Sequence, residues 1–484
     1  MSGVVQRVDE SVESTPEDEY KSLLRSLRRR KGFGLAFVRC SPVGGVELIK
    51  KVRDDLPQKQ IGVLELDQPI DNLINRVKDV PNQAQLNILF VVGLEKSLVD
   101  YIQTGYGGEG DYYNLDTIPP ILSHLNWQRE NFRDRFRHLC FVFLLPRFAI
   151  KYIIRRAPDF YDWASGKIDI PSSQEFVAQE SQRILGQDSD EYLEWTPQQC
   201  KERILEINEL LLESNRSQDQ QSSLLLEQGN IFYANNQYEE AIDSYDKALE
   251  IKPDYYKAWE NKGGVLFKLG QYEKAITAYD KALSIQPNYY QAWNNQGNGL
   301  LHLNRYEEAI SAYDKSIAIK SDFEQSYFSR GIALFSLGKN EEAIISIDNV
   351  LAIRSNFYEA WYVRGTVLWG LGRYEESIVS LDKAISIKPD FYEAWYIRGF
   401  ALVNLGRNEE AINSYDKALE IKPDDPNLYY NKACAYSLQK QIELALESLK
   451  KAIQLNYEKY REMSKTDSNF DNIRHDPRFQ ALIQ

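Results

Sequence analysis

Apolar and small residues recur every 34 positions from residue 222 onward, through seven units that begin at 222, 256, 290, 324, 358, 392 and 426. The second unit reads YKAWENKGGVLFKLGQYEKAITAYDKALSIQPNY. A large residue occupies the fourth place of each unit: Leu225, Trp259, Trp293, Tyr327, Trp361, Trp395 and Tyr429. The eighth place is small: Gly229, Gly263, Gly297, Gly331, Gly365, Gly399 and Ala433. Small residues also recur at the twentieth place. This spacing predicts two closely packed antiparallel helices per unit, with the fourth-place ring filling the gap between them.

A single hairpin of this kind cannot bury its apolar face, so the units must stack into a solenoid. Proline closes several units and would end their second helices: Pro253, Pro287, Pro389 and Pro423. The pattern closely resembles the tetratricopeptide repeat (TPR). The resemblance implies a superhelix whose concave groove is lined by places two, five, nine and twelve of each first helix. The residues that follow the repeats are expected to form a helical cap with a short docked helix.

The groove-lining places change character along the array. In units one to three they are mostly polar, as at Asn294 and Asn298, and in units four to seven they are mostly aromatic. The predicted partner-binding residues are Phe328, Ile332, Phe335, Tyr362, Trp369, Tyr396, Phe400 and Tyr430. Exposed apolar clusters usually mark binding surfaces, so we expect a peptide or helix of a partner protein to bind here. The alternative is that these rings only pack between neighbouring repeats.

Short apolar runs alternate with helical patterns over the first 170 residues, which predicts a parallel α/β sheet. The expected strands are 33–40, 61–66, 86–92, 139–145 and 167–170, and the expected helices are 17–31, 46–56, 70–79 and 119–137. Thr196-Pro197 begins an amphipathic linker helix. The predicted domains are a basic N-terminal helix (1–31), an α/β domain (32–170), a helical linker (171–221), the repeats (222–459) and a C-terminal cap (460–484).

One segment, VRCSPVGGVELI (Val38 to Ile49), has the strand–glycine loop–helix layout of a phosphate-binding loop. A working P-loop ends in G-K-[ST], where the lysine reaches the phosphates and the hydroxyl holds Mg²⁺. Here Val46 replaces the lysine and Glu47 replaces the hydroxyl, while Gly93 stands where an acidic magnesium ligand is expected. The negative charge of Glu47 would repel a triphosphate. These losses together argue against ATP hydrolysis.

Three further segments carry a second resemblance: LNWQRENFRDRFRH (Leu125 to His138), FVFLLP (Phe141 to Pro146) and APDFYDW (Ala157 to Trp163). With the strand order, they resemble a bacterial STAND-type P-loop NTPase domain over residues 15–170. STAND proteins are signalling NTPases that couple a P-loop switch to a repeat-based sensor, and this chain is most similar to inactive versions fused to TPRs. The resemblance implies oligomerisation or effector docking by this domain. Residual nucleotide contact would fall on Gly44, Gly45 and Arg147.

The net charge of −13 argues against nucleic-acid affinity of the whole chain. Two basic clusters, 21–31 and 129–156, keep a nucleic-acid-binding role open as an alternative. The four cysteines and four histidines lack metal-site or catalytic spacing, so we expect no catalytic residue, metal or cofactor. The glycine-rich segment 104–114 is expected to be a flexible loop. An acidic N-terminus and an interrupted apolar stretch at 139–154 predict a cytoplasmic protein without a membrane span.

The sequence therefore favours a non-catalytic scaffold, in which the TPR groove binds a partner protein and an inactive STAND-like domain mediates oligomerisation or effector docking. Two alternatives stay open. One is a nucleotide-responsive STAND-type switch with residual ATP binding, and the other is a nucleic-acid-binding regulator that uses the basic clusters.

Overall fold

The computed structural model describes residues 15–40, 42–102, 117–170, 174–186, 189–213 and 216–484. The chain divides into two compact units, Met1–Val265 and Leu266–Gln484, and each is described by itself. The first unit therefore contains the sheet, the linker helices, the first repeat and most of the first helix of the second repeat. The glycine-rich segment 104–114 lies outside the described residues.

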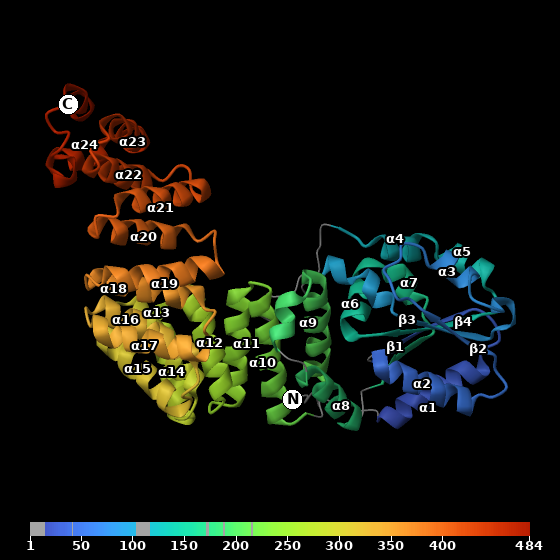
Figure 1. The fold of residues 1–484 in the computed structure, drawn as a ribbon. Helices are drawn as coiled ribbons and strands as arrows, with labels where there is room; N and C mark the ends of the chain where they lie inside the picture. Colours follow the sequence, from blue (N-terminus) through green and yellow to red (C-terminus); the bar gives the residue numbers. More distant parts are fainter. Residues whose placement is uncertain (1–14, 41, 103–116, 171–173, 187–188, 214–215) are drawn as a thin grey trace, which may run out of the picture. The chain divides into compact units, whose positions relative to one another are not determined.

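The first unit is built on a five-stranded parallel sheet in the order β2-β3-β4-β1-β5 (Figure 1). Its strands are β1 (Gly34–Arg39), β2 (Ile61–Glu65), β3 (Ile88–Val92), β4 (Cys140–Leu145) and β5 (Gly166–Asp169). The central strand β4 pairs with β1 on one side and β3 on the other, with Cys140 level with both Gly34 and Ile88. The predicted parallel sheet is confirmed.

Helices cover both faces of this sheet (Figure 1). One face packs against α1 (Pro16–Arg29) and α2 (Pro42–Asp55). The other packs against α3 (Leu73–Lys78), α4 (Pro120–Trp127), α5 (Arg129–Arg135), α6 (Arg147–Arg156) and α7 (Pro158–Asp162). Alternate residues of β1 supply the two cores, since Leu35 and Phe37 face one layer and Ala36 and Val38 face the other. Burial on both faces explains why the strands read as nearly unbroken apolar runs.

The sequence interpretation of two helices needs correction. The helix after β1 was expected to begin at residue 46, after a glycine loop, but α2 begins at Pro42 and contains both Gly44 and Gly45. Gly45 is buried, and a Cβ atom there would lie 3.0 Å from Leu144 Cδ1. Close packing of α2 on β4 therefore explains this glycine. The single helix expected over 119–137 is interrupted at Gln128, between α4 and α5.

Helical segments complete the first unit. They are α8 (Gln174–Leu185), η4 (Ser189–Glu194), α9 (Pro197–Leu212), α10 (Gln218–Ala234), α11 (Tyr238–Ile251) and the part of α12 (Tyr256–Lys268) up to residue 265. The predicted start of α9 is confirmed, because Thr196 and Gln199 form a reciprocal capping box. Leu205 of α9 joins the core on the α6 side of the sheet. The linker helix thus packs directly on the α/β layer.

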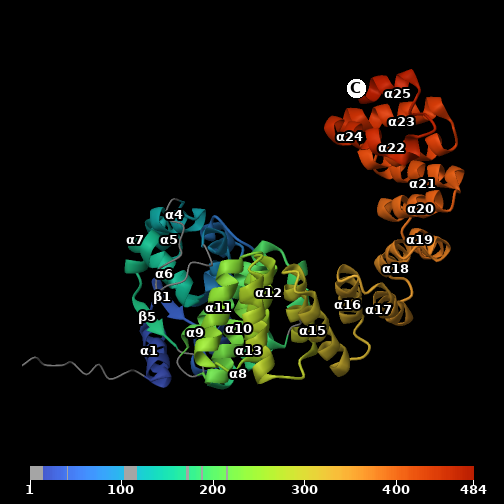
Figure 2. The same ribbon diagram turned by 90° about the vertical axis from the view of Figure 1, so that its left-hand side faces the viewer.

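The second unit is a stack of helical hairpins, which follow one another from α16 to α23 in Figure 2. Their first helices are α14 (Tyr290–His302), α16 (Glu324–Ser336), α18 (Tyr358–Gly370), α20 (Tyr392–Asn404) and α22 (Pro426–Leu438). Their second helices are α13 (Tyr272–Ile285), α15 (Tyr306–Ile319), α17 (Asn340–Ile353), α19 (Tyr374–Ile387), α21 (Asn408–Ile421) and α23 (Ile442–Leu455). The predicted helical solenoid is confirmed.

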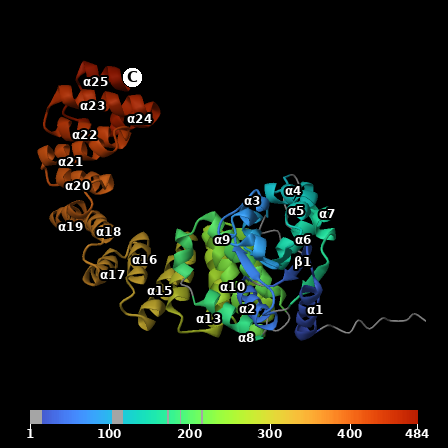
Figure 3. The ribbon, with the colours of Figure 1, turned by 90° about the vertical axis from the view of Figure 1, so that its right-hand side faces the viewer.

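A cap follows the last hairpin, formed by α24 (Tyr457–Thr466), η5 (Ser468–Phe470) and α25 (Pro477–Ile483) (Figure 3). Phe470, Phe479 and Ile483 are buried in one core with the side chains of α22 and α23. The short terminal helix that the sequence predicted is therefore present and docked.

In five of the hairpins, a glycine at place eight faces a large residue at place 24. A Cβ atom on Gly399 would lie 2.3 Å from the ring of Tyr415, so only glycine permits this helix–helix distance. The fourth-place rings also pack between the helices, since Trp361 is half-buried in one core with Leu381 and Ala384 of the second helix of its repeat. Trp293 in addition donates its indole N–H to the carbonyl oxygen of Pro287 at 2.8 Å. The fourth-place tryptophan thus fixes the turn that enters its repeat.

Candidate functional site

The predicted groove residues fall into two groups by exposure. Seven are half-buried: Phe328, Ile332, Phe335, Tyr362, Trp369, Tyr396 and Phe400. Tyr430 is only 3% exposed. All eight lie on first helices of the repeats, as expected. A half-buried ring packs against its own array and keeps some exposed area, so partner binding by these rings and purely internal packing both stay predictions.

The rings of the fifth and sixth repeats pack against one another in two groups. The ring centroids of Tyr396 and Phe400 are 4.8 Å apart in an edge-to-face arrangement, and those of Trp369 and Phe400 are 5.7 Å apart. Tyr362 packs on Phe391, with 5.0 Å between centroids. These contacts hold the rings in place, so a ligand would meet a surface that is already ordered.

The cap covers the groove at the seventh repeat. The hydroxyl of Tyr430 donates to Asp467 at 2.7 Å, and its ring lies 5.1 Å from the ring of Tyr460 and 5.6 Å from that of Phe470. Of the eight predicted residues, the seven in repeats four to six therefore keep partly exposed side chains, and Tyr430 does not. No local sequence signal at Tyr430 indicates this cover, because Asp467 is remote in the chain.

Two buried donors in this aromatic cluster lack an acceptor. In the third repeat, the hydroxyl of Tyr313 donates to Asn298 at 2.8 Å. In the sixth repeat, Phe400 occupies the place of that asparagine, and the hydroxyl of Tyr415 has no hydrogen-bond partner in the described structure. The indole Nε1 of Trp369, whose ring packs on Phe400, has none either. Each such donor raises the free energy of the unliganded groove.

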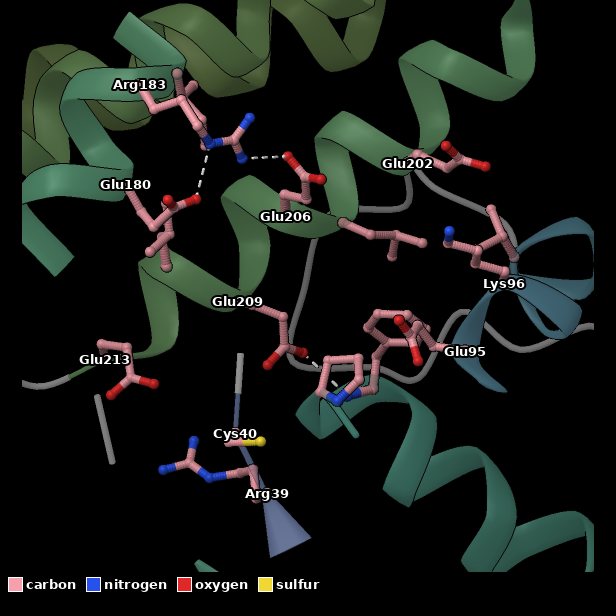
Figure 4. A pocket seen from close by; sticks show the side chains of 16 residues that line it. Arg39, Cys40, Glu95, Lys96, Glu180, Arg183, Glu202, Glu206, Glu209 and Glu213 are labelled. Atoms are coloured by element: carbon pink, nitrogen blue, oxygen red, sulfur yellow. Dashed lines mark hydrogen bonds and ion pairs between the residues drawn. The ribbon is translucent and has the colours of Figure 1, made fainter. Parts of the chain in front are cut away.

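A second candidate site lies in the first unit, where β1, β3 and β4 end. It is a cavity of about 230 Å³ beside Arg39, Glu95 and Pro146, which stand at or just after the ends of these strands. Ligands of parallel α/β sheets usually bind at this edge. Six glutamates line the cavity (Figure 4): Glu95, Glu180, Glu202, Glu206, Glu209 and Glu213. Its cationic side chains are Arg39, Lys96 and Arg183.

Glu209 of α9 binds the N-terminus of α6 (Figure 4). Its carboxylate accepts hydrogen bonds from the backbone N–H groups of Arg147 at 2.9 Å and Phe148 at 3.0 Å. A helix N-terminus favours an anion, and here a side chain of the same unit supplies it. Burial raises the pKa of Glu209, while the two hydrogen bonds and the nearby Arg39 and Arg147 oppose that rise.

The predicted nucleotide contacts do not gather around this cavity. Arg147 contributes its backbone N–H to Glu209, and neither Gly44 nor Gly45 lines the cavity. The N-terminus of α6, which could have held a phosphate, instead holds a carboxylate. The role of Gly44, Gly45 and Arg147 in nucleotide contact therefore stays a prediction.

Glu95 has a carboxylate group that is largely buried beside the cavity. Its Oε2 atom is shielded from solvent and has no hydrogen-bond partner in the described structure. Burial raises the pKa of Glu95 to about 7, against the attraction of Lys96. Burial and the charge of Glu95 also raise the pKa of the Cys40 thiol to about 12, so this cysteine is not a reactive thiolate.

The three cationic side chains that line the cavity have hydrogen-bond or ion-pair partners. Arg183 donates to Glu180 at 2.9 Å and to Glu206 at 3.1 Å. Arg39 pairs with Asp169, and Lys96 donates to the backbone oxygen of Asp67 at 3.4 Å. The sequence interpretation described α9 only as a connecting helix. The spacing of Glu202, Glu206, Glu209 and Glu213 puts a stripe of carboxylates on one helical face, and this signal was available.

The two basic clusters are partly neutralised. Lys21 on α1 lies 3.8 Å from Glu17. Arg129 on α5 lies 3.1 Å from Asp159, and Arg137 lies 3.4 Å from Asp134. These ion pairs reduce the positive potential that a nucleic acid would meet.

The repeats match known families. Residues 226–289, 278–311 and 426–459 match models described as tetratricopeptide repeat, and residues 297–338, 370–406 and 399–440 match a model described as TPR repeat. The C-terminal region, 226–459, is therefore a TPR array. None of these family models supports the P-loop resemblance of the first domain. No curated protein matches the chain.

Solved structures similar to this chain are TPR proteins. MamA is 27% identical, with a TM-score of 0.33 over 33% of this chain and 94% of MamA. YrrB, described as a TPR protein with an unusual peptide-binding site, is 26% identical, with a TM-score of 0.35 over 38% of this chain and 94% of YrrB. A tetratricopeptide repeat protein from Parabacteroides merdae is 21% identical, with a TM-score of 0.40 over 50% of this chain and 96% of its own.

Two features are absent from the described residues. None of their helices has both the length and the apolar composition that crossing a bilayer requires. Nor do three or more of their His, Cys, Asp or Glu side chains come together in a group that could hold a metal ion.

Proposed function

We propose that this protein is a non-catalytic interaction scaffold whose aromatic groove, in repeats four to six, binds an apolar segment of a partner protein. The half-buried rings of Tyr362, Tyr396 and Phe400 support this proposal most directly. A peptide or helix brings apolar side chains that would cover the exposed parts of these rings.

The energetics favour binding over internal packing alone. Fully burying one aromatic ring contributes about 1.5–3 kcal/mol, and a half-buried ring keeps part of that gain for a ligand. Because the rings are already packed, little ordering cost opposes binding.

The test uses the full chain and a double variant, Tyr362→Ala with Tyr396→Ala. A partner is first captured by co-purification with the wild-type chain, and its affinity is then measured with purified protein. We expect the double variant to bind at least about tenfold more weakly, because two rings are lost. Equal affinity would show that these rings serve internal packing only.

A matched control is a second double alanine variant at exposed positions outside the groove. Tyr457 and Ile345 are 55% and 61% exposed and lie outside the groove. The pair Tyr457→Ala with Ile345→Ala should leave partner affinity unchanged. Circular dichroism and the thermal midpoint of each variant would check that the array stays folded.

For the first domain, we propose an inactive STAND-like domain that mediates oligomerisation or effector docking. The crossover order of its parallel sheet and the absence of the P-loop lysine support this proposal. The carboxylates at the strand ends outnumber the cations, which disfavours a bound triphosphate. Equilibrium dialysis with labelled ATP and Mg²⁺ should show no binding tighter than about 100 μM, or about 5.5 kcal/mol. Tighter binding would favour the nucleotide switch instead.

A further inference from the structure

The cavity at the strand ends of the first unit has an excess of negative charge. Six glutamates face three cationic side chains there, and the three cations already have partners. Glu180 and Glu206 share Arg183, and Glu209 binds the N-terminus of α6. Glu95 and Glu202 take no part in these contacts among the described residues.

Glu95 shows most clearly what the cavity lacks. Its shielded Oε2 atom has no donor in the described structure, although a buried carboxylate oxygen normally receives at least one hydrogen bond. Glu202 is exposed on the facing helix α9 and accepts a hydrogen bond from the side-chain amide of Gln198 at 3.2 Å. An N–H donor that carries positive charge would satisfy both the hydrogen bond and the charge.

The walls between these carboxylates are apolar. They include Val99, Phe148, Ile184, Leu205 and Leu210. The volume of about 230 Å³ is smaller than a typical drug-sized pocket of about 300–1,000 Å³, so a small molecule fits it better than a peptide does. Apolar walls with a few charged groups at the edge suit a ligand that has an apolar body and one polar head.

We propose that this cavity binds a small organic cation, an ammonium or guanidinium group on a short alkyl body, with Glu95 and Glu202 as its anionic contacts. The alkyl body lies against Phe148 and Leu205. A phosphate is disfavoured, because Glu209 already occupies the N-terminus of α6 and the surrounding charge is negative. A metal ion is disfavoured as well, because the carboxylates stand on different sides of the cavity (Figure 4).

A bound ligand would also connect α9 to the carboxyl end of the sheet. Glu202 lies on α9, whereas Glu95 follows β3, so one ligand bound between them bridges two elements of the unit. Binding should therefore stabilise the first unit against thermal unfolding, by an amount that grows with ligand concentration.

The experiment uses the full chain and pentylamine as the probe, with 1-pentanol and pentanoate as matched neutral and anionic probes. Isothermal titration calorimetry and the thermal midpoint are measured for each. We expect saturable binding and a raised midpoint with pentylamine only. Equal binding of 1-pentanol would show a merely apolar cavity and overturn the proposal, and so would preferential binding of pentanoate.

Variants locate the site. Glu95→Gln and Glu202→Gln should each weaken pentylamine binding by about tenfold, because each removes a charged hydrogen bond. Glu409→Gln, on the exposed surface of α21, is the matched control and should bind as the wild type does. If both cavity variants keep wild-type affinity, the amine binds elsewhere and the proposal is wrong. The groove variant Tyr362→Ala with Tyr396→Ala should keep full affinity, so this test is independent of partner binding.

Discussion

The third and sixth repeats share one framework and present different grooves. Both carry glycine at place eight and tyrosine at place 24, and a Cβ atom on Gly297 or Gly399 would lie 2.5 or 2.3 Å from the facing tyrosine ring. Place nine differs, with Asn298 in the third repeat and Phe400 in the sixth. That one exchange leaves a hydroxyl bonded in the third repeat and unpaired in the sixth.

The same two repeats differ in how they join the preceding repeat. At place seven of the sixth repeat, Arg398 donates to Asp382 of the fifth repeat at 2.6 Å. Equivalent Arg–Asp contacts join the fourth repeat to the third and the fifth repeat to the fourth. In the third repeat, Gln296 donates to Asp280 at 2.5 Å without bringing a positive charge. Positions that set the helix–helix distance are thus constant, whereas positions that set polarity and charge vary. The array can change what it binds without changing how it folds.

The largest effect should come from the shared framework. Gly297→Ala and Gly399→Ala each force a Cβ atom against a buried ring, so each should lower the free energy of unfolding by about 1–3 kcal/mol. Urea denaturation of the full chain measures this. Gly264→Ala is the control, because no atom lies within 4 Å of its Cβ position, and it should gain up to about 1 kcal/mol from helix propensity. A similar loss at all three positions would contradict the packing account.

A smaller effect should separate the two repeats. Tyr313→Phe removes a hydrogen bond and leaves Asn298 without its donor, so it should cost about 1 kcal/mol. Tyr415→Phe removes a hydroxyl that has no partner in the described structure, so stability should stay equal or rise. The difference between their urea midpoints measures this contrast. If Tyr415→Phe costs as much as Tyr313→Phe, the hydroxyl of Tyr415 has an acceptor after all.

The smallest effect concerns the contact between Gln296 in the third repeat and the carboxylate of Asp280 in the second repeat. Burial raises the pKa of Asp280, against the hydrogen bond from Gln296, so the folded chain holds that proton more strongly than the unfolded chain. Stability therefore falls as pH rises through this raised pKa. Gln296→Arg should pair the carboxylate and recover about 0.2–1 kcal/mol at neutral pH. The gain should vanish in acid, where Asp280 is protonated, and a gain that is independent of pH would rule out this ion pair.

The sequence predicted the repeats and the strands well, because a 34-residue period and short apolar runs are local signals. Place number alone also predicted that Tyr396 and Phe400 lie on the first helix of their repeat. The burial of Tyr430 was missed, because its partner Asp467 lies in the cap. The cavity was missed for a similar reason, since Glu95 and Glu209 meet only when α9 packs across the strand ends. Gly45 was misread as part of a loop, although its role is close packing on β4.

The cap also sets a limit on how the array can assemble. An additional hairpin joining the stack beyond the seventh repeat would need the surface of α22 and α23 that η5, α24 and α25 now occupy. Copies of this chain therefore cannot polymerise by adding repeats end to end at that position. The cap therefore closes this end of the stack, and any assembly of several copies must use a different surface.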